Sequence, residues 1–246
     1  MRPKALFVGP WWWAISRTDS SIEGVNALWA RLSEVVDHEP YAWPNFKARS
    51  GDPSWQAIVA EMRRQMPDGG YLIDVGPAGV LSLLAVSGEP KVKALVMGGM
   101  FVPPATLRAL GMNHQADGCS ALFRTNRAHQ LARLNLQGAP EEFIRQVGEQ
   151  MDAGLDWERT AELQRSFESI NLLENRPDVR IPVLYMDPPL AAAGFAEMAG
   201  VLLDFVPHAR IQPTEVYPMK MQDAAASVEF AEKALVFIDE IEKGSG

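Results

Sequence analysis

The stretch YLIDVGPAGVLSLLAV, residues 71–86, has the pattern of a buried strand that runs through a tight turn into an apolar helix. Many enzymes carry their nucleophile on a turn of this kind. Here the turn consists of Gly76, Pro77 and Ala78, and none of these side chains can attack a carbonyl group. The first question is therefore what such a turn does without a reactive side chain.

The segments on either side of this stretch alternate between short apolar runs and amphipathic runs of helical length. Such alternation predicts an α/β fold, in which a parallel sheet is covered by helices. The expected strands span residues 4–9, 70–76, 92–99, 179–187 and 209–216. The expected helices of this layer span residues 21–36, 52–66, 78–88, 194–207 and 227–243. For the helix at 52–66, we expect Asp52 and Pro53 to form its start.

Residues 103–178 have a different character, because no β-rich run interrupts their helical segments. The expected helices there span residues 104–112, 120–136, 140–154 and 156–170. The sequence therefore predicts two parts. Residues 1–102 and 179–246 form a core, and residues 103–178 form a helical cap inserted into it.

Composition excludes several classes of function. The chain has 246 residues, a formal net charge of −8 and no cluster of Lys and Arg, which argues against a nucleic-acid partner. The single cysteine, Cys119, cannot form an intramolecular disulfide, as expected for a cytoplasmic protein. The apolar run at 5–15 is interrupted by Gly9 and Pro10 and is too short to span a membrane. We therefore expect no signal peptide and no membrane partner.

The four histidines are scattered, and none stands in a spacing typical of metal ligands. They are His38, His114, His129 and His208. The sequence also lacks the glycine spacing of a dinucleotide-binding loop. We therefore expect neither a metal nor a cofactor. His114 is the histidine that we place near the roof of a pocket.

Three local segments resemble the α/β-hydrolase family. LIDVGPAGVLSLLAVSGEPKVKALVMGG (72–99) is similar to the family's elbow strand, elbow helix and following strand. FESINLLENRPDVRIPVLYMD (167–187) is similar to its return from cap to core, and VPHARIQPTEVYPM (206–219) to the segment around its catalytic histidine. The resemblance implies a mostly parallel sheet flanked by helices, with a helical cap.

The resemblance also implies a catalytic triad, and this sequence departs from it at every position. Depending on the overlay of the G-x-S-x-G motif, the nucleophile corresponds to Gly76 or Pro77. The segment expected to hold the acid contains Leu190 and Ala191, and Val216 stands in the place of the histidine. In the overlay that puts Gly76 in the nucleophile position, the next residue is Pro77. Proline lacks the backbone N–H that would help to stabilise an oxyanion. We therefore expect no ester hydrolysis.

The resemblance aligns Val8–Trp13 with the family's second oxyanion loop. Three adjacent tryptophans, Trp11, Trp12 and Trp13, follow Pro10 there. One interpretation is that at least one indole lines a pocket and offers flat apolar surface to a ligand. The alternative is that the indoles pack between sheet and cap.

These observations lead to a first hypothesis of a non-hydrolytic protein, a pseudoenzyme, that uses the former active-site cavity for binding. Its partner would be a small, mainly apolar molecule, a protein or a second copy of the chain. The candidate ligand-binding residues are Trp11, Trp12, Trp13, Asp74, Gly76, Pro77, His114 and Tyr217. Asp74 has two possible roles: accepting N–H groups of the turn, or contacting the ligand.

The alternative hypothesis is a cofactor-free enzyme of another class, such as a cyclase, isomerase or lyase. It would hold an apolar substrate in the same cavity and use an acid or phenol for proton transfer. The candidates for that role are Asp74, His114, Glu215 and Tyr217.

Overall fold

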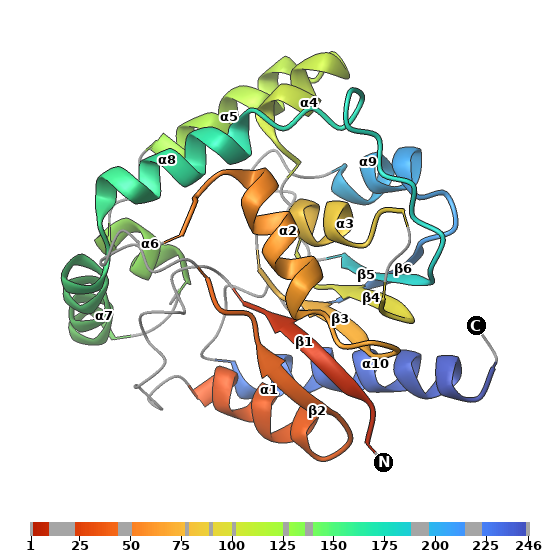
Figure 1. The fold of residues 1–246 in the computed structure, drawn as a ribbon. Coiled ribbons are helices and arrows are strands. Elements are labelled where there is room, and N and C mark those ends of the chain that lie inside the picture. The colour runs from red at the N-terminus through yellow and green to blue at the C-terminus, as the bar shows by residue number, and fades with distance from the viewer. Residues whose placement is uncertain are drawn as a thin grey trace.

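Six parallel strands form the centre of the fold (Figure 1). The computed structural model describes residues 2–9, 23–43, 51–76, 79–88, 91–99, 102–124, 128–135, 140–187, 197–214 and 223–244. Its strands are β1 (Lys4–Val8), β2 (Asp37–Pro40), β3 (Tyr71–Asp74), β4 (Ala94–Met97), β5 (Val183–Asp187) and β6 (Arg210–Pro213). They pair in the order β2-β1-β3-β4-β5-β6, and every neighbouring pair is parallel. All carboxyl ends therefore lie at one edge of the sheet.

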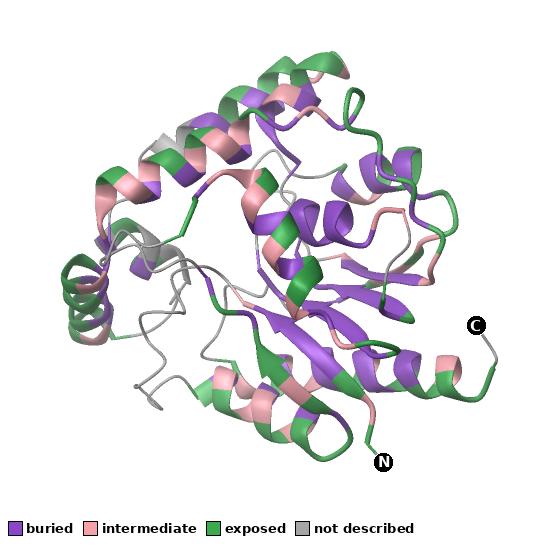
Figure 2. Cartoon of the chain, viewed as in Figure 1, coloured by how far each residue is buried: buried purple, intermediate pink, exposed green. Residues whose placement is uncertain are grey.

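Helices cover both faces of this sheet, so the inner strands are apolar on both sides. One face carries α1 (Glu23–Ser33) and α10 (Ala224–Glu242); the other carries α2 (Trp55–Gln65), α3 (Gly79–Ala85) and α9 (Met198–Phe205) (Figure 1). Successive strand residues alternate between the two faces: Ile73 packs with Phe230 of α10, and Leu72 belongs to the cluster on the α2 side. Figure 2 shows α3 and the inner strands as buried.

Five described helices lie between β4 and β5, in the region where the sequence predicts a cap. They are α4 (Pro104–Ala109), α5 (Asn113–Arg124), α6 (Ala128–Asn135), α7 (Glu141–Gly154) and α8 (Trp157–Glu168). The start of the helix expected at 120–136 is wrong, because α5 already begins at Asn113. Residues 125–127, between α5 and α6, lie outside the described residues. Figure 1 shows α4, α5 and α8 above α2 and α3. The division into a core and a cap as separate units stays a prediction.

Two further features differ from the expectations. Strand β2 has no counterpart among the expected strands, because its sequence is Asp37-His38-Glu39-Pro40 and its residues are exposed or half-buried. It lies at the edge and pairs only with β1, a position that tolerates both polar residues and proline. The start of α2 is formed by Ser54, whose hydroxyl accepts a hydrogen bond from the backbone N–H of Ala57 at 3.3 Å.

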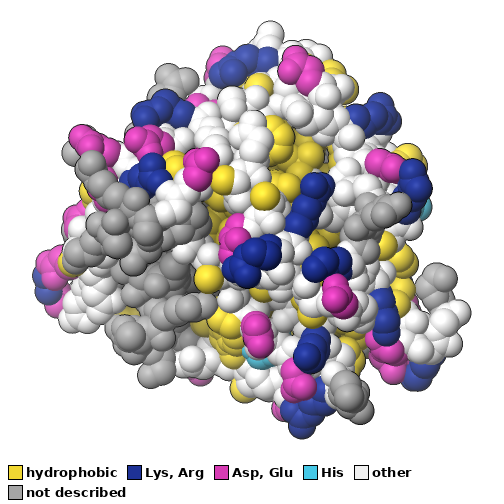
Figure 3. Space-filling view, in the orientation of Figure 1, with side chains coloured by type: hydrophobic (Ala, Val, Ile, Leu, Met, Phe, Trp, Pro, Cys, Tyr) yellow, Lys and Arg dark blue, Asp and Glu magenta, His cyan; other side chains and the backbone are white. Residues whose placement is uncertain are grey.

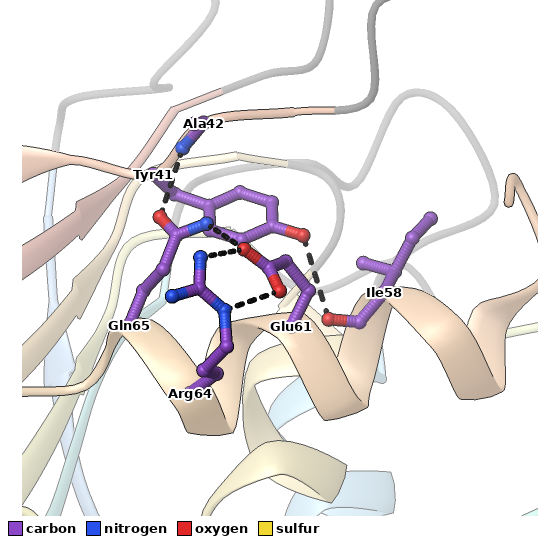
Figure 4. Close-up of polar contacts among 6 residues, drawn as sticks. All are labelled: Tyr41, Ala42, Ile58, Glu61, Arg64 and Gln65. Atoms are coloured by element: carbon purple, nitrogen blue, oxygen red, sulfur yellow. Dashed lines mark hydrogen bonds and ion pairs between the residues drawn. The ribbon is translucent and has the colours of Figure 1, made fainter. Parts of the chain in front are cut away.

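A polar cluster attaches the chain after β2 to α2 (Figure 4). The residues drawn there are Tyr41, Ala42, Ile58, Glu61, Arg64 and Gln65. The backbone N–H of Ala42 donates to Gln65 Oε1 at 3.2 Å, and Gln65 Nε2 donates to Glu61 Oε1 at 2.6 Å. Hydrogen bonds from Arg64 and Gln65 lower the pKa of Glu61 to about 2. The cluster thereby fixes one side of α2 relative to the sheet.

Candidate active site at the carboxyl end of β3

Asp74 is the last residue of β3, and it is the one buried residue with a charged side chain among the described residues. In the sheet it lies between Val8 of β1 and Met97 of β4, which are both fully buried. Because side chains alternate along a strand, Asp74 shares a face with Leu72 and points to the side covered by α3. The sheet therefore places one carboxyl group in apolar surroundings at its carboxyl edge.

Both carboxyl oxygens of Asp74 accept hydrogen bonds. The backbone N–H of Gly76 donates to Oδ1 at 2.7 Å, and the hydroxyl of Ser82 on α3 donates to Oδ2. The first bond is the turn contact that the sequence indicates as one role for Asp74; a contact with a ligand stays a prediction.

Burial raises the pKa of Asp74 to about 7, although the hydrogen bonds from Ser82 and Gly76 act in the opposite direction. Removing the carboxylate from water disfavours its charged form. Near neutral pH, Asp74 can therefore both take up and release a proton, which is the property needed in a general acid or base.

The turn after Asp74 brings α3 very close to the end of β4. A Cβ atom at Gly79 would lie 2.3 Å from the carbonyl oxygen of Gly99, so only glycine fits there. Gly79 is the last position of the G-x-S-x-G motif in the overlay that puts Pro77 in the place of the nucleophile. Gly76 is buried and is not among the described glycines with positive φ. Pro77 and Ala78 lie outside the described residues.

A second carboxyl group, that of Asp187, ends β5 at the same edge of the sheet. It is half-buried, and burial raises its pKa. The carbonyl oxygen of Asp187 accepts a hydrogen bond from the backbone N–H of Thr214 at 3.0 Å, which ties β5 to the end of β6. The resemblance places the family's acid after this position, in the segment that contains Leu190 and Ala191. That segment lies outside the described residues.

The remaining candidates are distributed as follows. His114 lies exposed near the start of α5. Residues outside the described part of the chain are Trp11, Trp12, Trp13, Pro77, Leu190, Ala191, Glu215, Val216 and Tyr217. Their ligand contacts, and the absence of a complete triad, stay predictions.

Sequence reasoning did not identify Ser82 as the partner of Asp74. The signal was present, because Ser82 is the one polar residue in the apolar helix GVLSLLA, residues 79–85. A fully buried hydroxyl requires a hydrogen-bond partner, and the carboxyl group that ends the preceding strand supplies one.

Within the described part of the chain, no three His, Cys, Asp or Glu residues gather in a way that could hold a metal ion. In the same part, every helix is too short or too polar to cross a membrane. On the face drawn in Figure 3, cationic and anionic side chains are interspersed.

Comparison with known proteins identifies the fold. No family model and no curated protein sequence matches the chain. Among solved structures, an esterase (EaEST) from Exiguobacterium antarcticum has a TM-score of 0.70 at 13% identity, covering 96% of this chain and 92% of the other. A bromoperoxidase from Bacillus anthracis has a TM-score of 0.69 at 14% identity, covering 97% and 92%. An enol-lactonase from Burkholderia xenovorans LB400 has a TM-score of 0.63 at 13% identity, covering 98% and 92%.

These neighbours contradict the hypothesis of a non-hydrolytic pseudoenzyme, since they are named as enzymes and two of them as hydrolytic ones. The alternative of a cyclase, isomerase or lyase gains no support from them. The predicted architecture, a mostly parallel sheet flanked by helices, is confirmed. At this level of identity the likeness shows the fold: the chain has the α/β-hydrolase fold.

Proposed function

We propose that this chain is a hydrolase that cleaves small, mainly apolar esters or lactones at the carboxyl edge of the sheet. The observation that carries the proposal is the buried carboxyl group of Asp74, with a pKa of about 7, at the end of β3. Support for the reaction class comes from the fold, which the chain shares with proteins named as an esterase and an enol-lactonase.

The reaction that suits this group is attack by water without a covalent intermediate. Gly76 offers no nucleophile, whereas the carboxylate of Asp74 can take a proton from water as the oxygen attacks the carbonyl carbon. The proton then passes to the leaving alkoxide when the carbon–oxygen bond breaks. Each carboxylate oxygen has two lone pairs, so each can accept a bond from water in addition to its present one. Asp74 is fully buried in this structure, so the proposed reaction requires an opening that admits water and substrate to the carboxyl group.

Two neighbours hold Asp74 in position for this role. The N–H of Gly76 and the hydroxyl of Ser82 each contact a different oxygen, so they fix the plane of the carboxyl group. A group held in this way loses little entropy when the reactants align. Because the base must be deprotonated, the rate should rise with pH and level off above about pH 7.

The test is hydrolysis of p-nitrophenyl esters and γ-lactones by the wild-type chain and by Asp74→Asn. Asparagine preserves the shape of the side chain but cannot act as a base, so we expect turnover to fall by about 10²- to 10⁴-fold. The matched control is Asp239→Asn, an exposed residue paired with Lys243 on α10, which should leave turnover unchanged. Absence of turnover in the wild type, or full turnover in a folded Asp74→Asn variant, would refute the proposal.

A further inference from the structure

Four side-chain polar atoms of the described cap helices are buried and have no hydrogen-bond partner. They are Arg159 Nε, Thr160 Oγ1 and Gln164 Nε2 on α8, and Gln115 Oε1 on α5. Thr160 is 1% exposed and Gln115 is 5% exposed. Most buried polar groups are paired, because an unpaired one retains the full cost of leaving water. Atoms that are left unpaired in this way are therefore candidates for contact with a ligand.

Two of the atoms on α8, those of Thr160 and Gln164, point to the same side of that helix. Thr160 and Gln164 are four residues apart, so they lie one turn above each other. Leu163 and Phe167 share this side and belong to the apolar cluster that also contains Met97, the neighbour of Asp74 in the sheet. Thr160 and Gln164 therefore lie on the side of α8 that faces the apolar core beneath the cap. Figure 3 shows hydrophobic side chains at the surface between the cap helices and α3.

A second buried threonine of the cap shows that lack of a partner is not general in this region. Thr106 on α4 is fully buried, and its hydroxyl donates to the carbonyl oxygen of Ile170 at 2.9 Å. The same hydroxyl accepts a hydrogen bond from the N–H of Leu172 at 2.9 Å. The fold therefore provides hydrogen-bond partners for the hydroxyl of Thr106 and none for the hydroxyl of Thr160.

We propose that Thr160 and Gln164 bind a neutral carbonyl group of the substrate, separate from the carbonyl that is hydrolysed. A hydroxyl and an amide NH₂ can both donate, and one carbonyl oxygen accepts two hydrogen bonds. The group is neutral, because Thr160 and Gln164 are uncharged donors. The Nη1 and Nη2 groups of the adjacent Arg159 already bind Glu162 and the carbonyl oxygen of Gly51, and only its Nε has no partner. Leu163 and Phe167 contact the apolar part that links the two carbonyls. The identity of this ligand as a substrate rests on the proposed function.

The test is a binding measurement with two probes that cannot be hydrolysed. One is N-hexanoyl-3-aminotetrahydrofuran, which has an amide carbonyl, and the other is 3-heptyltetrahydrofuran, which has methylene groups in its place. We expect the amide to bind the wild-type chain at least tenfold more tightly by isothermal titration calorimetry. A site built to hydrogen-bond a ligand discriminates strongly against an analogue that lacks the group.

Thr160→Val and Gln164→Leu remove the donors while keeping the size of the side chains. Each variant should lose most of the preference for the amide. In the ligand-free protein, Thr160→Val should also raise Tm, because it removes an unpaired buried hydroxyl. The control Thr106→Val should lower Tm, because it leaves the N–H of Leu172 and the carbonyl oxygen of Ile170 without their partner.

Equal binding of the two probes, or binding of neither, would overturn the proposal. So would an amide preference that survives in both variants, or a fall in Tm for Thr160→Val as large as that for Thr106→Val, which would indicate that Thr160 is satisfied in the folded protein. Hydrolysis is measured separately, so an amide preference without turnover would refute the proposed reaction and leave this binding site intact.

Discussion

The end of β3 and helix α8 treat buried polar groups differently. At the end of β3, both oxygens of Asp74 have hydrogen-bond partners within the fold, and the carbonyl of the same residue accepts the N–H of Gly98 at 2.6 Å. On α8, Thr160 and Gln164 each bury a polar atom without a partner. The fold itself supplies partners in the first arrangement, whereas the second has a cost that a ligand could offset.

Packing also differs between two buried glycines beside the sheet and one exposed glycine of the cap. An added Cβ would lie 2.3 Å from the Gly99 carbonyl oxygen at Gly79 and 2.2 Å from the Phe230 ring at Gly98. At Gly118 on α5, no atom lies within 4 Å of the same position. The sheet side therefore has no free space at these points, while the exposed side of α5 has.

The largest expected effect concerns the pH dependence of stability that Asp74 causes. The pKa of Asp74 is about 7 in the folded protein, whereas an ordinary aspartic acid has a pKa of 3.8. The folded state therefore holds the proton more tightly than the unfolded state does. Between these values unfolding releases a proton, and the free energy of unfolding should fall as pH rises, by up to about 4 kcal/mol in total. Asp74→Asn removes the titration and should abolish this part of the decline, measured by urea denaturation from pH 4 to pH 8.

Ser82→Ala supplies the control for that experiment. The Ser82 hydroxyl lowers the pKa of Asp74, so its removal should move the decline to higher pH without abolishing it. If the wild type and Asp74→Asn lose stability in parallel over this range, Asp74 is not the buried acid described above.

Gly79→Ala should destabilise the core by about 3 kcal/mol, within the range for overpacking of a tightly packed interior. The reason is the contact with the backbone of Gly99, which cannot move away as a flexible side chain would. Thermal or chemical denaturation measures the loss. A neutral result would mean that α3 can shift away from β4, and it would weaken the contrast between the two regions.

A smaller effect on stability is expected at the N-terminal caps of α8 and α10. Binding of the amide probe should distinguish the two helices. Asp156 caps α8 by accepting the N–H groups of Glu158 and Arg159, and Asp223 caps α10 by accepting that of Ala226. Either substitution by alanine should cost about 1 kcal/mol of stability. Only Asp156→Ala should reduce the preference for the amide probe, since α8 carries Thr160. An equal reduction in both variants would point to a general loss of folded protein.

The sequence predicted the inner strands well, because strands buried on both faces read as apolar runs such as YLID and ALVM. It did not predict β2, since an edge strand carries little apolar signal. The turn after β3 was located, but the contact between Asp74 and Ser82 spans a strand end and a helix and has no periodic pattern. Thr160 was assigned only to a helix, because lack of a partner is a property of three-dimensional packing.

The smallest expected effect is a gain in stability in the cap. Gly118 lies inside α5, is exposed, and would place an added methyl group in open space. Alanine restricts the unfolded chain and favours the helix, so Gly118→Ala should stabilise the protein by about 0.5–1 kcal/mol. Because Gly118→Ala and Gly79→Ala are the same chemical change, comparing their denaturation midpoints isolates the space around each site. If Gly118→Ala also destabilises the protein, the exposed side of α5 is packed against another part of the chain, and the cap is as tightly filled there as the sheet is at Gly79.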